Sequence, residues 1–216
     1  MPTGAAAEID TATNTLLRTI EGVTDDIGHL AVSRDGLCLY AGLSRGRNMM
    51  AVRPTILVEG KAGEAVGFGK ALGGRGGGLS GVVVLPGPDG TRLLVFQHYE
   101  GIVALDPATL AVKTRYKYRE WGDITNVAPS PDGRHLYLSV VGEEGRIVDA
   151  ETLAETGTFP AGGYGMCVGS DGTLCVAEDG VGVLLRPGTD PLERREIGLP
   201  AHPMVAVQAA PTTWRP

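Results

Sequence analysis

The chain has 216 residues, with 19 basic and 25 acidic side chains, so its formal net charge at pH 7 is −6. This acidic balance, with only three Phe and two Trp, argues against a nucleic-acid partner, which needs a basic face and stacking aromatic rings. No apolar run approaches the roughly 18 residues of a membrane span, and residues 1–11 lack the features of a signal peptide. We therefore expect a soluble, cytoplasmic protein without a membrane partner, or a secreted one if a leader has been removed.

Glycine is abundant, at 33 residues, and aromatic residues are scarce. Such a balance favours many tight turns between short strands. No segment combines a sustained 3.6-residue apolar period with a capping signal. The sequence therefore predicts an all-β protein with essentially no helix.

The first predicted element is a β-hairpin, IDTATNTLLRTI (9–20), and related stretches return at 104–116 and 148–159. Each has an Asp at the start of the turn, namely Asp10, Asp106 and Asp149. Such an Asp can accept hydrogen bonds from backbone N–H groups two residues further on, so we interpret the three carboxylates as structural. Degenerate versions of the same turn are expected at 52–56 and 186–193.

A second turn signature alternates with the first and places Asp-Gly between two apolar runs. Asp-Gly suits a tight hairpin because glycine adopts a positive φ without a steric penalty. Together the two signatures predict four antiparallel strands per repeat, with a small or β-branched first strand. The Asp-Gly turns are SRDG (33–36), GPDG (87–90), SPDG (130–133) and GSDG (169–172).

The repeat recurs at intervals of roughly 40–50 residues, close to the 40–45 of propeller blades. We therefore predict a β-propeller of about five four-stranded antiparallel blades, forming one domain over 1–216. The hairpin IDTATNTLLRTI followed by SPDG and LYLS resembles the YVTN-type β-propeller repeat, most clearly at 9–42 and 102–140. This resemblance implies a scaffold and leaves the function open.

The two ends of the chain predict a shared last blade. The chain begins with the third and fourth strands of a blade and ends on a possible first strand, HPMVAVQA (202–209). Propellers usually close by combining terminal strands in one blade, which removes exposed edges. The second strand is missing here, so three interpretations remain: five blades with one incomplete, which we favour, a piece of a larger propeller, or an open ring completed by a partner or a second copy.

Loops at one mouth of the channel are the predicted binding site for a small molecule or a protein. They combine carboxylates, amides, aromatic rings and cations that can hold a polar ligand. The loop QHYEGI (97–102) places a His and a Glu two residues apart, which could supply a base and its orienting group. The weak catalytic candidates are His29, His98 and Glu100, and the binding candidates are Arg45, Arg47, Tyr99, Trp121, Asp123, Asn126, Glu143 and Glu178.

The longest departure from the repeat is a glycine-rich insert at about 60–80. Glycines beside Lys70 and Arg75 could form an anion-binding nest of backbone N–H groups. The sequence lacks the residue order of a phosphate-binding loop, however, so we favour a flexible lid or a plain insertion.

Cys167 and Cys175 flank the GSDG turn symmetrically and are expected to face each other as buried thiols, with Cys38 elsewhere. No metal-ligand motif or other cofactor motif is evident, although Mg²⁺ or Ca²⁺ could bind at an acidic mouth. We expect a non-enzymatic binding module. The alternative is a lyase or hydrolase acting on a cyclic ester or lactone, similar to the streptogramin lyase and gluconolactonase groups, with His29, Asp123, Asn126 and Glu178 converging.

Overall fold

The computed structural model describes most of the chain as nineteen β-strands, with no helix among the described residues. Contacts divide the chain into two compact units, Met1–Tyr118 and Arg119–Pro216, which are described separately. The described residues are 4–10, 12–24, 29–33, 35–45, 49–57, 59–64, 66–69, 79–87, 90–97, 101–116, 122–160, 162–163, 165–178, 181–186 and 193–198.

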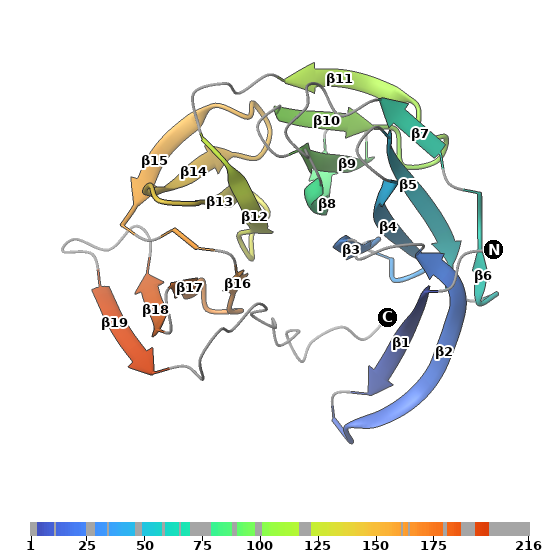
Figure 1. The fold of residues 1–216 in the computed structure, drawn as a ribbon, viewed down its shortest axis with the longest axis horizontal. Helices are drawn as coiled ribbons and strands as arrows, with labels where there is room; N and C mark the ends of the chain where they lie inside the picture. The colour runs from blue at the N-terminus through green and yellow to red at the C-terminus, as the bar shows by residue number, and fades with distance from the viewer. Residues whose placement is uncertain are drawn as a thin grey trace. The chain divides into compact units, whose positions relative to one another are not determined.

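The first unit holds three antiparallel sheets (Figure 1). A two-stranded sheet pairs β1 with β2, a five-stranded sheet has the order β3-β4-β5-β6 with β7 also on β5, and a four-stranded sheet has the order β11-β10-β9-β8. The strands are β1 (Gly4–Asp10), β2 (Thr15–Thr24), β3 (His29–Val32), β4 (Cys38–Arg45), β5 (Met49–Ile56), β6 (Lys61–Ala62), β7 (Val66–Gly69), β8 (Leu79–Gly87), β9 (Gly90–Gln97), β10 (Gly101–Leu105) and β11 (Val112–Tyr116).

The second unit holds two four-stranded antiparallel sheets, with the orders β12-β13-β14-β15 and β16-β17-β18-β19. In both, strands consecutive in sequence are neighbours in space. The strands are β12 (Ile124–Pro129), β13 (His135–Val140), β14 (Gly145–Asp149), β15 (Glu155–Phe159), β16 (Gly165–Val168), β17 (Leu174–Glu178), β18 (Val181–Arg186) and β19 (Glu193–Gly198).

These sheets are the blades of a β-propeller, which confirms the predicted fold class. Four sheets have at least four strands, and the first sheet has two. The expectation of about five blades with one incomplete is therefore met among the described strands. The predicted closing strand 202–209 lies outside the described residues.

The core of the first unit consists of two apolar clusters on opposite faces of the β3–β4 pair. One face packs Tyr40, Ala31 and Cys38 against β8, β9 and β10. Tyr40 also donates a hydrogen bond from its hydroxyl to the Pro107 carbonyl at 3.0 Å, which links β4 to the turn after β10. The other face packs Leu39 and Ala41 against side chains of β1 and β2.

The core of the second unit lies between its two sheets. Tyr137 and Phe159 meet edge to face, with ring centroids 6.2 Å apart and an interplanar angle of 78°. Met166, Leu174 and Val183 from the following sheet join the same cluster. Gly145 has no side chain because Phe159 occupies that space: a Cβ there would overlap the ring.

The predicted Asp turns form as expected. The Oδ1 atom of Asp10 accepts hydrogen bonds from the backbone N–H groups of residues 12 and 13, and Asp106 and Asp149 do the same at their own turns. The fourth residue after each Asp has a positive φ, and these residues are Asn14, Leu110 and Leu153. The carboxylates are thus part of the turns.

One local prediction in the five-stranded sheet was wrong. Residues 52–56 were expected to form a turn, but they lie within β5 and the turn follows at 57–60, where Gly60 N–H donates to the Leu57 carbonyl. The insert, for which we favoured a flexible lid or a plain insertion, contains β6 and β7, which pair with β5. β5 itself continues through Pro54.

Candidate functional site

Most of the predicted mouth residues cannot be placed. Residues 98–100 lie outside the described residues, as do Arg47 and Trp121. Arg45 and Glu178 are described only as backbone at the ends of β4 and β17. These candidates stay predictions.

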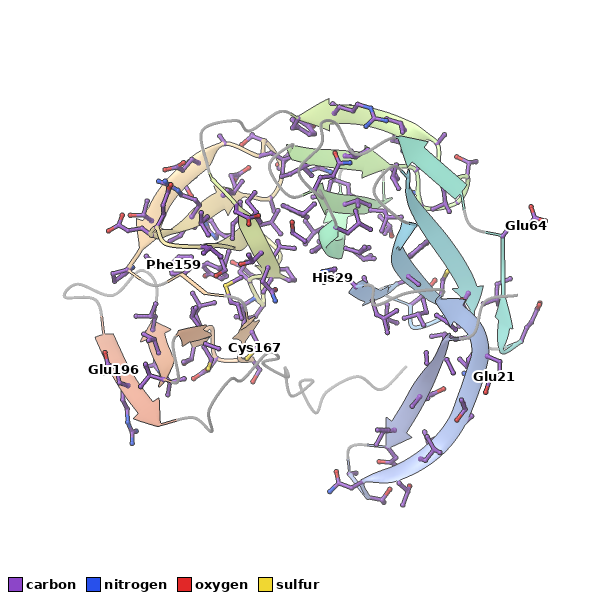
Figure 2. The ribbon with its side chains drawn as sticks, in the orientation of Figure 1. Glu21, His29, Glu64, Phe159, Cys167 and Glu196 are labelled. Atoms are coloured by element: carbon purple, nitrogen blue, oxygen red, sulfur yellow. The ribbon has the colours of Figure 1, made fainter. Side chains whose placement is uncertain are left out.

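His29 lies at the start of β3 and turns toward the neighbouring blade (Figure 2). Its Nε2 atom is 3.0 Å from the carbonyl oxygen of Leu79 on β8, so in the tautomer protonated at Nε2 the ring donates to that carbonyl. A hydrogen bond to backbone fixes the orientation of the imidazole. The ring therefore connects two blades of the first unit.

Asp123 and Glu143 lie at the same end of the sheet β12–β15. The Val141 N–H donates to the Asp123 carbonyl at 3.2 Å, and a Cβ on Gly122 would come within 3.2 Å of the Glu143 carboxylate. Glu143 accepts from Arg146 at 3.1 Å, so its charge is already paired at the surface. The third described candidate of this sheet, Asn126, lies on β12 opposite Ser139.

A hydrogen-bonded group at this end of the sheet was missed by the sequence analysis. The Ser139 hydroxyl donates to the Gly163 carbonyl at 2.7 Å and accepts from the Gly163 N–H at 2.8 Å. The Thr125 hydroxyl donates to the same carbonyl at 2.6 Å. The only sequence signal was a Ser within the apolar strand HLYLSV. These bonds satisfy buried polar groups and hold the 162–163 backbone against β12 and β13.

The first sheet presents a different kind of candidate site, an open strand edge. β1 pairs with β2, and no other described strand pairs with it. The sequence of β1, GAAAEID, contains no Lys or Pro, two of the residues that protect exposed edges from pairing. Because no described strand uses the N–H and C=O groups on this side of β1, they can accept another strand.

One face of β3 is uncovered beside that edge. Leu30 lies opposite Ala41, and Val32 lies opposite Leu39, so all four side chains share one face of the sheet. Leu39 and Ala41 are buried under β1 and β2, whereas Leu30 and Val32 are each 51% exposed.

The geometry explains this exposure. The order of the covered sheet is β3-β4-β5-β6, and β2 lies against β4, β5 and β6. β3 is therefore the strand of this sheet that lies beyond β2. A strand added to the free edge of β1 would extend the first sheet toward β3 and cover Leu30 and Val32. The edge of β1 with which no described strand pairs, together with the Leu30 and Val32 side chains, is called the vacant blade position below.

The described side chains contain no cluster of three or more His, Cys, Asp or Glu that could hold a metal ion. No helix suited to crossing a membrane occurs in the part of the chain that the structure describes.

Comparisons with known proteins agree on the fold and do not give a family. No family model matches the chain, and no curated protein matches it by sequence. A solved structure of hydrazine synthase from Kuenenia stuttgartiensis is similar over 90% of this chain, with a TM-score of 0.61 and 14% sequence identity. This chain spans 60% of the length of that chain. At such low identity, the likeness shows the β-propeller fold alone.

Proposed function

We propose that this β-propeller is a protein-interaction module that binds a β-hairpin of a partner at the vacant blade position. The carrying observation is that no described strand other than β2 pairs with β1, while Leu30 and Val32, on the neighbouring blade, are half exposed. Addition of strands to an open sheet edge is a general mode of peptide recognition, in which backbone hydrogen bonds supply affinity and alternate side chains supply specificity.

The shape of the position favours a hairpin over a single strand. Each of the other sheets has at least four strands, whereas the first has two. Two added strands would give it the same width. The partner hairpin needs small or branched apolar residues on alternate positions of one face, because that face meets Leu30 and Val32.

Charge does not oppose such a partner. Glu8 lies on the face of β1 that turns toward the five-stranded sheet. Its carboxylate forms an ion pair with the Arg18 guanidinium at 2.5 Å. The remaining side chains at the centre of β1 are alanines, which leave the backbone accessible.

A synthetic hairpin tests this proposal. Residues 124–140 of this chain form the two inner strands β12 and β13 of a complete blade, so a peptide of that sequence is a suitable probe. We expect it to bind the full chain, as measured by calorimetry. Binding should shift the amide resonances of residues 4–10 and 29–32.

A matched pair of variants locates the binding. Val32→Lys places a charge on the vacant blade position and should weaken binding by roughly 10-fold or more, because an apolar contact is replaced by a desolvated ammonium group. Val112→Lys changes the same residue type on β11, at a side chain that is also exposed, and should bind like the parent protein. Failure of the probe to bind, or equal loss in both variants, would contradict the proposal.

The mouth loops and the predicted lyase or hydrolase activity are a separate matter. Their main candidates, residues 98–100 and the side chain of Glu178, are outside the described part of the chain. No described contact favours that activity, and it stays a prediction, together with the Mg²⁺ or Ca²⁺ site.

A further inference from the structure

Two cysteines of the second unit lie directly opposite each other on adjacent strands. In the antiparallel pair β16–β17, Cys167 is the register partner of Cys175. Both are free and partly buried, and Cys167 is labelled in Figure 2. This confirms the expectation that they face each other across the hairpin.

The register places the two thiols within reach of a covalent bond. Residues directly opposite each other on antiparallel strands have Cα atoms about 4.5–5.5 Å apart, and disulfides usually join Cα atoms about 4.4–6.8 Å apart. Cys167 and Cys175 are such a pair.

The thiols lie on the face of the sheet that does not enter the core described above. Met166, Val168, Leu174 and Val176 are buried in that core. The cysteines alternate with them and therefore point to the other face, where Leu184 of β18 is the register neighbour of Cys175. Both thiols are partly exposed on this face.

Burial, and then the adjacent Cys175 thiol, raise the pKa of Cys167. Because the thiolate is the reactive form, Cys167 reacts slowly at neutral pH and faster as the pH rises.

We propose that Cys167 and Cys175 form a reversible dithiol–disulfide site, oxidised by exchange with a low-molecular-weight disulfide of the glutathione type. The thiolate of one cysteine attacks the small disulfide, forming a mixed disulfide and releasing one small thiolate. The second cysteine then attacks the protein sulfur of the mixed disulfide and releases the second small thiolate. Overall, the protein gives up two electrons and two protons, and the small disulfide is reduced to two thiols.

The new bond would join strands that are already paired, so the fold is kept. It would close a short loop around the turn at 169–173 and restrict the unfolded chain. The expected consequence is a more stable oxidised form of the second unit. Cys38 belongs to β4 of the first unit and takes no part.

The test uses the full-length chain and glutathione disulfide at mildly alkaline pH. After oxidation, the remaining free thiols are blocked. A protease that cleaves before Asp171 then cuts the protein, with no reducing agent present. This cut separates Cys167 from Cys175 in sequence. We expect the two fragments to stay joined, with a mass lower by two hydrogen atoms than their sum, and the oxidised chain to melt roughly 5 °C higher than the reduced one.

Single variants provide the controls. Cys38→Ser should give the same cross-linked fragments, because it leaves the pair intact. Cys175→Ser should give no cross-link and only a mixed disulfide or a free thiol at Cys167. If the parent chain yields only mixed disulfides or free thiols at Cys167 and Cys175, while urea-unfolded chain reacts fully, the proposal is overturned.

Discussion

The hairpins β1–β2 and β14–β15 use the same turn chemistry but differ in what surrounds them. Asp10 and Asp149 make the same pair of hydrogen bonds to backbone N–H groups. The residue before Asp10 is Ile9, which is 55% exposed. The residue before Asp149 is Val148, which is fully buried. The comparison shows that the turn is a local property, whereas burial depends on the two inner strands β12 and β13, which have no counterpart beside β1 among the described strands.

The residue with positive φ shows the same difference. In the first hairpin it is the exposed Asn14, and in the later hairpins it is Leu110 and Leu153, which are buried. Asn tolerates the left-handed region better than Leu does. The later blades therefore offset the strain of a left-handed Leu by burying its side chain, whereas the first hairpin has an exposed Asn at this position.

The largest predicted effect tests burial at the residue before the Asp. Leu105→Ala removes a buried side chain before Asp106 and should lower the free energy of unfolding by about 2–5 kcal/mol. Ile9→Ala alters the equivalent position of the first hairpin and should change it by less than about 0.5 kcal/mol. Urea unfolding followed by circular dichroism measures both. Equal losses would mean that the first hairpin is as well packed as the sheet of β8 to β11.

The next effect tests the packing around β14. Gly145→Ala should lower the free energy of unfolding by about 1–3 kcal/mol, because the new methyl group overlaps Phe159, which is buried in the core. Gly157→Ala on β15 is the control, since its Cβ would make an ordinary contact with Ile147 at 3.7 Å. Thermal melts should separate the two variants clearly, and similar melting temperatures would contradict this account of Gly145.

A smaller effect is expected in the first turn. Asn14→Ala should lower the free energy of unfolding by about 0.5–1 kcal/mol, because alanine is less tolerant of a positive φ than Asn. Asn14→Gly should change it little, since glycine adopts this conformation without a steric penalty. A chemical-denaturation series of the three proteins checks the order, and a neutral Asn14→Ala would show that the turn is not formed in solution.

The smallest effect concerns pH. The Thr109 N–H, followed by Lys113 and the Thr109 hydroxyl, lowers the pKa of Asp106 to about 2. An unfolded Asp titrates near a pKa of about 3.9, so the stabilisation by Asp106 is complete above that pH and is lost as the pH falls toward 2. Asp106→Asn should therefore reduce the loss of stability between about pH 4 and 2. Urea midpoints across this range measure the slope, and an unchanged slope would exclude the carboxylate as its source.

The sequence could predict the architecture because the information is local and repeated. Asp10, Asp106 and Asp149 each define a turn by their own hydrogen bonds, and the Asp-Gly turns recur between apolar runs. The turn expected at 52–56 was wrong because no such Asp is present there, and β5 simply continues through those residues.

The vacant blade position was harder to foresee. Leu30 and Val32 have the same alternating pattern as first strands whose apolar faces are covered. Their exposure depends on inner strands that other blades have and that no described strand supplies beside β1. The sequence predicts an incomplete blade, but not which side chains that leaves uncovered. The mouth candidates were drawn from loops that share no repeated pattern, so nothing local determined their positions.

Hydrogen exchange along β1 tests the open edge most directly. In the isolated chain at low concentration, we expect residues 4–10 to alternate between slow exchange, where the N–H donates to β2, and fast exchange, where it faces the free edge. In β14, which is paired on both sides, residues 145–149 should show no such alternation. Slow exchange at every amide of β1 would mean that its edge is already paired, and would contradict the account.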